Sequence, residues 1–172
     1  MASLMENLIE VLENECQEYE SLLTLSEEKS PVIVRGDLEA LARITDREQE
    51  AVERIGHLEK ERQETFRDIA GVINRDVNNL KLGDLVDMLS QRPGEQKKLA
   101  GVHDRLRSAV YAVKRVNDQN RALLTNAMEM VEFEMNMLKT MKTGPETAGY
   151  NRGAEAFGMQ MGAPASGFDA KQ

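Results

Sequence analysis

The stretch that decides the fold is "LEALARITDREQEAVERIGHLEKERQETFRDIAGVI", residues 38–73, which contains no proline. A mainly apolar stripe of residues recurs along it in steps of three and four, which is the spacing of a single helical face. Ile44, Ala51, Leu58 and Val72 widen this stripe on one side. A wide stripe favours a multi-helix bundle over a two-stranded coiled coil, which needs only a narrow seam. The stripe consists of Leu38, Leu41, Thr45, Glu48, Val52, Ile55, Glu59, Arg62, Phe66, Ile69 and Ile73.

On the N-terminal side, the same period predicts a helix over residues 3–29. Pro31 and Gly36 in "EEKSPVIVRGD", residues 27–37, are expected to end that helix. Asp37 is the expected N-cap of the next helix, because its carboxylate can accept free N–H groups of the first turn. The apolar run 32–34 is interpreted as a connection packed on the end of the bundle.

On the C-terminal side, "NRDVNNLKLGDLVDMLSQRPGE", residues 74–95, favours turns. Within it, "DLVDML" predicts one or two helical turns capped by Asp84. A long helix is then expected from about Gly94 to about Lys142. Its predicted seam is Leu99, His103, Leu106, Val110, Val113, Asn117, Asn120, Leu124, Ala127, Val131, Glu134, Leu138 and Met141, with a flanking row at Val102, Ala109, Val116, Leu123, Met130 and Met137.

Residues 143–172 differ in composition, since they hold six of the twelve glycines and show no helical period. Such a segment lacks the apolar content to offset its ordering entropy. The predicted fold is therefore all-α: an antiparallel bundle of three long helices with a short extra helix in residues 1–142, and a flexible C-terminal tail in residues 143–172.

Composition excludes several classes of partner. The formal net charge is −8 and the isoelectric point is about 4.9, so phosphate backbones and anionic membranes should repel the chain. Cys16 is the only cysteine, which rules out an intrachain disulfide. Neither a signal peptide nor the roughly 18 consecutive apolar residues of a membrane span is present. We expect a cytoplasmic protein that binds no nucleic acid and does not insert into a membrane.

Catalytic and metal sites are not indicated either. Glu53 and His57 lie one helical turn apart, but a di-metal carboxylate bundle needs Glu-x-x-His motifs on two helices. His103 is interpreted as a hydrogen-bonded core histidine, and Cys16 as an inert buried thiol. "SQRPGEQKK" lacks the spacing of a phosphate-binding loop. We therefore expect no enzyme, no metal site and no cofactor.

Two amides interrupt the apolar seam of the last long helix. Asn117 and Asn120, in "RVNDQNRALL", residues 115–124, are both expected to point into the bundle. An unpaired buried amide costs about 1–3 kcal/mol, so each needs a partner. Counting along the helices places Glu48 and Arg62 within a turn or two. A polar layer that fixes helix register is one interpretation; direct contact with a partner protein is the other.

The order of these motifs resembles a known family. "EEKSPVIVRGDLEALARITDREQEAVERIGHLEKER", then "LKLGDLVDML", then "VNDQNRALL" is similar to the FlgN-type flagellar export chaperones, over about residues 1–142. The resemblance implies a cytoplasmic type III secretion chaperone that binds the C-terminal helical segments of hook-associated proteins. It would prevent their premature assembly and deliver them to the flagellar export apparatus. A chaperone for another flagellar client, such as the filament cap, and a scaffolding coiled-coil protein remain alternatives.

The end of the last helix is the candidate client site. Half of the ten methionines lie there, and antiparallel counting places Leu38 opposite about residue 136, so the final turns are expected to be uncovered. Methionine surfaces adapt to varied apolar partners. The alternative is that these methionines fill the core; a weak homodimer through the heptads is also open. The predicted client-binding residues are Leu123, Ala127, Met130, Val131, Met137, Leu138 and Met141.

Overall fold

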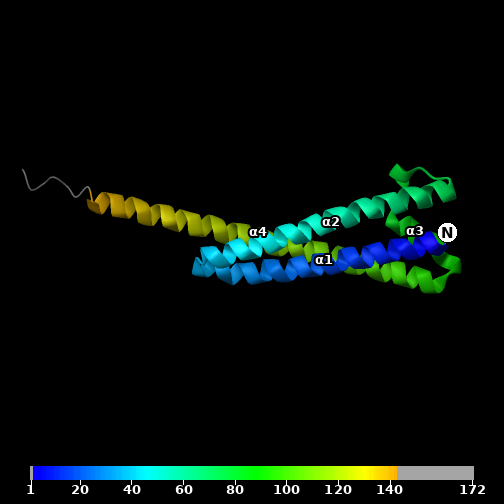
Figure 1. Ribbon diagram of the computed structural model, residues 1–172, viewed down its shortest axis with the longest axis horizontal. Coiled ribbons are helices and arrows are strands. Elements are labelled where there is room, and N and C mark those ends of the chain that lie inside the picture. Colours follow the sequence, from blue (N-terminus) through cyan, green and yellow to red (C-terminus); the bar gives the residue numbers. More distant parts are fainter. Residues whose placement is uncertain (1, 143–172) are drawn as a thin grey trace, which may run out of the picture. The chain divides into compact units, whose positions relative to one another are not determined.

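A computed structural model describes residues 2–142 of the chain. Its elements are α1 (Ala2–Arg35), α2 (Leu38–Ile73), the 3₁₀ turn η1 (Val77–Asn79), α3 (Leu82–Met88), the 3₁₀ turn η2 (Leu89–Gln91) and α4 (Pro93–Lys142) (Figure 1). No strand occurs among residues 2–142, and the prediction of three long helices plus a short one is confirmed. The predicted tail, residues 143–172, lies outside the described residues.

The chain divides into two compact units, residues 1–129 and residues 130–172. Within the first unit, α1 and α2 run antiparallel, since Glu15 pairs with Arg62 and Glu28 with Arg47. The N-terminal part of α4 runs parallel to α1, because residues later in α1 contact residues later in α4. Glu20 pairs with Arg105, and Ser30 bonds to Asn120. Of the second unit, residues 130–142 are described, and they form the C-terminal turns of α4.

A tight turn connects α1 to α2. Gly36 has φ = 67°, and its N–H donates to the Ile33 carbonyl at 3.1 Å while the Asp37 N–H donates to the Val32 carbonyl at 3.3 Å. This pair of bonds ends α1 in the Schellman arrangement, which favours glycine at the left-handed position. The Asp37 carboxylate then accepts the Ala40 N–H at 3.0 Å, so the predicted N-cap of α2 is confirmed.

The predicted end of the first helix at residue 29 is wrong, because α1 continues through Pro31 to Arg35. Pro31 leaves the Glu27 carbonyl without its helical donor. Both residues lie on the exposed side of α1, where water can take that carbonyl. On the opposite side Val32 and Ile33 are buried and hold the last turn in place. The apolar run is therefore the end of a helix and not a separate connection.

Asp84 also has a different role from the predicted one. α3 begins at Leu82, with Lys81 in the N-cap position, and Asp84 is the third residue of the helix. Its carboxylate accepts the Lys81 backbone N–H at 2.8 Å. The side chain thus satisfies a free donor from inside the first turn instead of from the cap.

The core of the first unit is made of three apolar clusters along the helices. The largest joins α1, α2, α3 and α4 around Leu8, Ile69, Leu85 and Leu99, each at most 1% exposed. The second cluster contains Leu22, Ala51, Ile55 and Val113, and the third contains Leu25, Val32 and Ile44. Buried polar side chains also lie along these helices, and their contacts are described below.

The face of α4 that is buried differs from the predicted seam. Within the seam, the row of His103, Val110 and Asn117 is not buried. The buried face is centred between the row of Leu99, Val113 and Asn120 and the row predicted to flank it. Spacing alone could not locate this centre, because a stripe three rows wide contains several equally regular seven-residue rows. The buried residues of α4 are Leu99, Val102, Ala109, Val113, Val116 and Asn120.

Candidate functional site

One group of polar side chains connects all three long helices of the first unit, and we call it the polar layer: Ser26, Lys29, Ser30, Glu48 and Asn120. The Asn120 amide donates to the Ser26 carbonyl at 2.7 Å, and its oxygen accepts the Ser30 hydroxyl at 2.6 Å. The Ser26 hydroxyl donates to Glu48 at 3.0 Å, and the Lys29 ammonium donates to the other Glu48 oxygen at 2.7 Å. Ser26 and Asn120 are buried, at 0% and 3% exposure.

Asn120 therefore has partners for both ends of its amide, whereas Asn117 is exposed. The prediction that both amides point into the bundle is wrong for Asn117, because it belongs to the row outside the buried face. Asn120 bonds to Ser26 and Ser30, which are residues of α1. The count along the helices had considered only residues of α2 as partners, so it missed them. The signal was present in the sequence: Ser26 and Ser30 lie one turn apart on the apolar side of α1.

Arg62, a charged residue within the mainly apolar stripe of α2, forms an ion pair with the buried Glu15 of α1. Glu15 is 2% exposed, and its Oε2 lies 3.0 Å from Arg62 Nε, although without the alignment of a hydrogen bond. Burial raises the pKa of Glu15 above its ordinary value of 4.5; the charge of Arg62 opposes this rise and that of Glu59 adds to it. Desolvation thus outweighs the attraction between the two charges.

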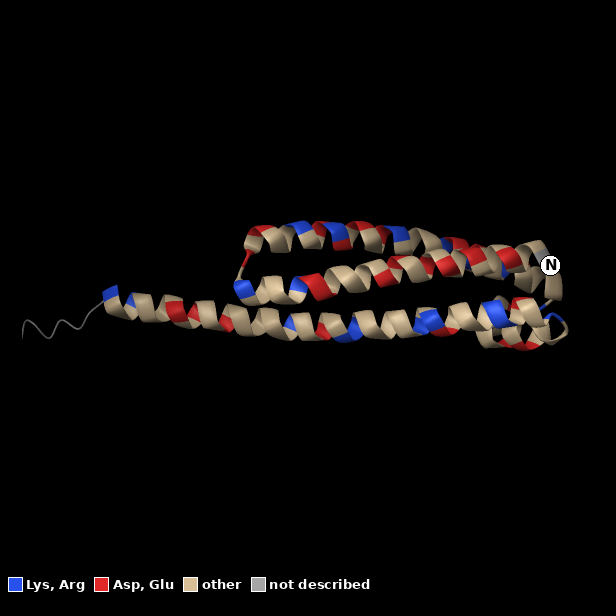
Figure 2. Ribbon diagram, turned by 90° about the horizontal axis from the view of Figure 1, so that it is seen from below, with Lys and Arg blue, Asp and Glu red and all other residues tan. Residues whose placement is uncertain are grey.

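Other ion pairs connect the helices at the surface. Figure 2 shows how acidic and basic residues are distributed along the helices. Glu20 of α1 accepts two hydrogen bonds from Arg105 of α4, each 2.8 Å long. Arg105 holds the pKa of Glu20 below its ordinary value through these bonds. Acids of α1 also pair with bases of α2, as Glu18 does with Arg54 at 2.9 Å. Water and salt screen exposed pairs of this kind, so they contribute little to stability.

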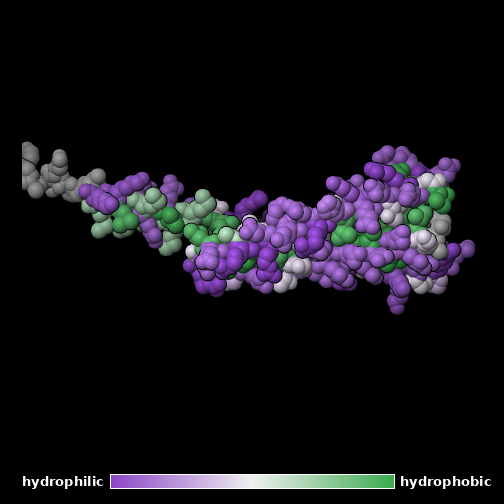
Figure 3. Space-filling model, in the orientation of Figure 1, coloured by the Kyte–Doolittle hydropathy of each residue, from purple (hydrophilic) through white to green (hydrophobic). Residues whose placement is uncertain are grey.

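Apolar side chains of the C-terminal turns of α4 are exposed, and Figure 3 shows them gathered on this segment. Their exposed fractions are 65% for Met130, 55% for Val131, 56% for Met137, 60% for Leu138 and 72% for Met141. The other two predicted client-binding residues, Leu123 and Ala127, belong to the first unit and are partly buried. We call these seven residues the α4 face. None of the five methionines between residues 128 and 141 is buried, so they do not fill the core.

The level at which the α1–α2 turn lies along α4 follows from the polar layer. Ser30 contacts Asn120, and α1 ends five residues later at Arg35. Because parallel helices rise equally per residue, the turn lies level with about Thr125. Counting along the sequence had placed Leu38 opposite about residue 136, which is too far along α4. The partial burial of Leu123 and Ala127 agrees with a turn that lies level with about Thr125.

A family model described as "FlgN protein" matches residues 1–156 of the 172-residue chain. The chain belongs to the FlgN family. FlgN proteins are flagellar export chaperones for hook-associated proteins; they are cytoplasmic and have no enzymatic activity. The resemblance found in the sequence is therefore confirmed, and with it the chaperone function and the hook-associated clients.

Most of this FlgN-family chain is also similar to a Bacillus protein. It is 29% identical over 132 residues to "Uncharacterized protein YvyG" of Bacillus subtilis (strain 168), which covers 76% of this chain and 78% of that protein. No solved structure matches it. The extent of both matches shows that the similarity includes the bundle and is not confined to one helix.

The chemically reactive residues of this FlgN protein are scattered. His57 is exposed, and His103 is 39% exposed with Nδ1 3.4 Å from Asp104, so the prediction of a core histidine is wrong. Cys16 is buried, its thiol lies 3.7 Å from Glu20, and burial raises its pKa. Residues 2–142 contain no group of three or more His, Cys, Asp or Glu that could hold a metal ion. Nor does any described helix have a stretch long and apolar enough to cross a membrane.

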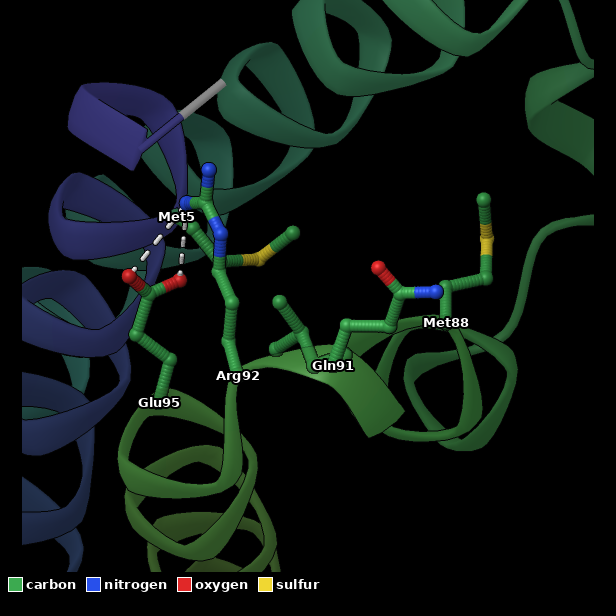
Figure 4. Close-up of a pocket in the computed structure, with 6 residues that line it drawn as sticks. Met5, Met88, Gln91, Arg92 and Glu95 are labelled. Carbon is green, nitrogen blue, oxygen red and sulfur yellow. Dashed lines mark hydrogen bonds and ion pairs between the residues drawn. The ribbon is translucent and has the colours of Figure 1, made fainter.

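A small cavity of about 200 Å³ lies where the N-terminus of α1 meets η2 and the start of α4 (Figure 4). Met5, Met88 and Leu89 line it together with Gln91 and the ion pair between Arg92 and Glu95, whose closest approach is 3.4 Å. Met5 and Leu89 are buried members of the largest core cluster. The cavity is thus a gap in the end of the core, and it has neither the depth nor the converging polar groups of a ligand site.

Proposed function

We propose that the C-terminal helical segment of a hook-associated protein docks on the α4 face: Leu123, Ala127, Met130, Val131, Met137, Leu138 and Met141. The observation that carries this proposal is the exposure of the last five residues, each more than half accessible. Neighbouring apolar side chains that remain this accessible are typical of a surface that binds another protein.

The composition of the face suits more than one client. Methionine is unbranched and has three rotatable side-chain bonds, so it adjusts to apolar surfaces of different shape. Val131 and Leu138 lie seven residues apart between the methionines and supply a less variable centre. An amphipathic client helix that lies along α4 would bury its apolar stripe against them. The client would then be unable to use that stripe for assembly.

The test uses the full-length chain with Val131 and Leu138 both changed to glutamine. Glutamine is a good helix former, so the change removes apolar surface without breaking α4. Burial of each side chain against client is worth about 1.5–3 kcal/mol, so we expect the affinity for a client C-terminal peptide to fall at least about tenfold. Isothermal titration calorimetry gives the affinity, and circular dichroism checks the helix content.

Tyr111→Gln is the matched control. Tyr111 is 71% exposed on the same helix and lies outside the α4 face. We expect this variant to bind client as the unchanged chain does. If the double variant still binds client normally, the client site lies elsewhere.

We also propose that the chain acts in the cytoplasm, delivers its client to the flagellar export apparatus and forms at most a weak homodimer. Family membership supports the first two points. Delivery is tested by following hook-associated proteins in the culture medium of cells that carry the double variant. We expect them to be missing from the medium, and undiminished export would exclude delivery through this face.

A further inference from the structure

The α4 face ends at Met141, one residue before the end of the helix at Lys142, and the chain then continues to residue 172. This last part, residues 143–172, carries five large apolar side chains of its own. Four of the five come after residue 156, where the match to the family model ends. They are Tyr150, Phe157, Met159, Met161 and Phe168.

The connection between face and tail is short. The face from Met130 to Met141 covers eleven helical rises, or about 17 Å. An extended chain advances about 3.3 Å per residue, so five or six residues are enough to run back along it. Gly144 and Pro145 follow the helix at once, and this dipeptide favours a turn. Residues 150–168 can therefore reach the part of the face from Met130 to Met141 without strain on the chain.

We propose that residues 150–168 cover the α4 face of their own chain whenever no client is bound. This inference rests on the proposed function, because it gives the client site a competitor. A tethered segment is present at a local concentration in the millimolar range, which a second copy of the chain would reach only in a concentrated solution. The tail thus occupies the face first, and its few apolar side chains make it easy to displace.

The consequence is a reduced apparent affinity for client. When a site is free for only a fraction of the time, the apparent dissociation constant equals the intrinsic one divided by that fraction. A tail that covers the face nine-tenths of the time therefore weakens client binding about tenfold. It also keeps the methionines from contacting unrelated apolar surfaces before a client arrives.

The experiment uses the full chain with its methionine methyl groups labelled for NMR. In the client-free protein we expect nuclear Overhauser contacts between the Met137 and Met141 methyls and aromatic protons of the tail. Changing Tyr150, Phe157 and Phe168 together to serine should abolish these contacts and shift both methyl signals. The same variant should bind the client C-terminal peptide about threefold to tenfold more tightly.

Tyr111→Ser is the matched control, because Tyr111 is an aromatic residue of α4 that is 71% exposed and lies outside the face. It should change neither the methyl signals nor the client affinity. Methyl signals that the tail variant leaves in place, or a tail variant that binds client with equal or lower affinity, would overturn the inference. So would methyl contacts that depend on protein concentration, since a second copy would then be the occupant.

These readouts separate the two proposals. The contacts between tail and methyls are measured without client, so they remain valid if the client binds elsewhere. If Val131→Gln with Leu138→Gln leaves client binding intact, the proposed client site fails, whatever the tail does. If that double variant loses client binding but the tail contacts are missing, only the covering role of the tail fails.

Discussion

At the scale of single residues, the first unit depends on a few buried polar atoms with unequal partners. Asn120 uses both ends of its amide, and Ser26 and Glu48 continue the chain of hydrogen bonds to α2. Glu15, in contrast, lies against Arg62 without an aligned hydrogen bond. Satisfied buried polar groups specify an arrangement, while a poorly paired buried charge lowers stability. The two sites should therefore respond to substitution in opposite directions.

Asn120→Ala should destabilise the bundle, because it removes the partner of the Ser30 hydroxyl and both hydrogen bonds of the amide. We expect a loss of about 1–3 kcal/mol in the free energy of unfolding, measured by urea denaturation. Asn117→Ala is the control, and as an exposed site it should change stability by at most about 0.5 kcal/mol. Equal effects of the two substitutions would contradict a structural role that is particular to Asn120.

Glu15→Gln should stabilise the protein near neutral pH. Because burial raises the pKa of Glu15 in the folded state, the folded chain binds this proton more tightly than the unfolded chain. The contribution of Glu15 to stability is thus most favourable below pH 4.5 and declines as the pH rises through its folded pKa. Glutamine removes the buried charge, and we expect the melting temperature at neutral pH to rise by about 2–4 °C.

The pH dependence provides the check on Glu15. The advantage of Glu15→Gln should shrink as the pH is lowered toward 4.5, where the natural side chain becomes protonated. Melting curves recorded by circular dichroism across this range measure it. A variant less stable than the natural chain at neutral pH would mean that the attraction of Arg62 outweighs the desolvation of the carboxylate.

At the scale of elements, the sequence predicted those helix ends that a local chemical signal marks. Asp37 and the stripe that follows it located the start and end of α2, and the Gly94 region located the start of α4. The end of α1 was missed, because burial of Val32 and Ile33 outweighs the local cost of Pro31. The centre of the buried face of α4 was missed as well, since it depends on what α1 places opposite. Local sequence signals thus determine where most of these helices begin and end, whereas tertiary contacts determine which face of a helix is buried.

Gly36→Ala tests the turn between α1 and α2. Gly36 has a left-handed backbone with no atom near its missing Cβ, so the cost of alanine is conformational and not steric. We expect a loss of about 1–2 kcal/mol in the free energy of unfolding by urea denaturation. Gly56→Ala is the control, since that helical site is equally open but has ordinary dihedral angles. It should gain about 0.5–1 kcal/mol, and a gain at both sites would show that the turn tolerates alanine.

At the scale of the whole molecule, the fold class and family could be predicted from the sequence, but the partners of the polar residues could not. The fold class could be predicted because helical period and composition are properties of each chain segment by itself. The family could be predicted from the order of the motifs along the chain. The contacts of Asn120 and of Arg62 depend on the relative register of three helices, which spacing within each helix leaves open. The exposure of Met137 and Met141 agrees with the interpretation of this segment as an open surface, while client binding there remains a proposal.

The exposed face also makes a prediction about assembly in solution. Two copies could bury their α4 faces against each other, but a client helix would need the same side chains. We therefore expect sedimentation velocity to show a monomer at micromolar concentration and at most a weak dimer at higher concentration. If client and dimer both use Val131 and Leu138, as we propose, adding client peptide should dissociate that dimer. Glutamine at both positions should weaken dimer and client complex together, whereas Tyr111→Gln should leave them unchanged. A permanent oligomer that client does not dissociate would instead indicate a scaffold built through another surface.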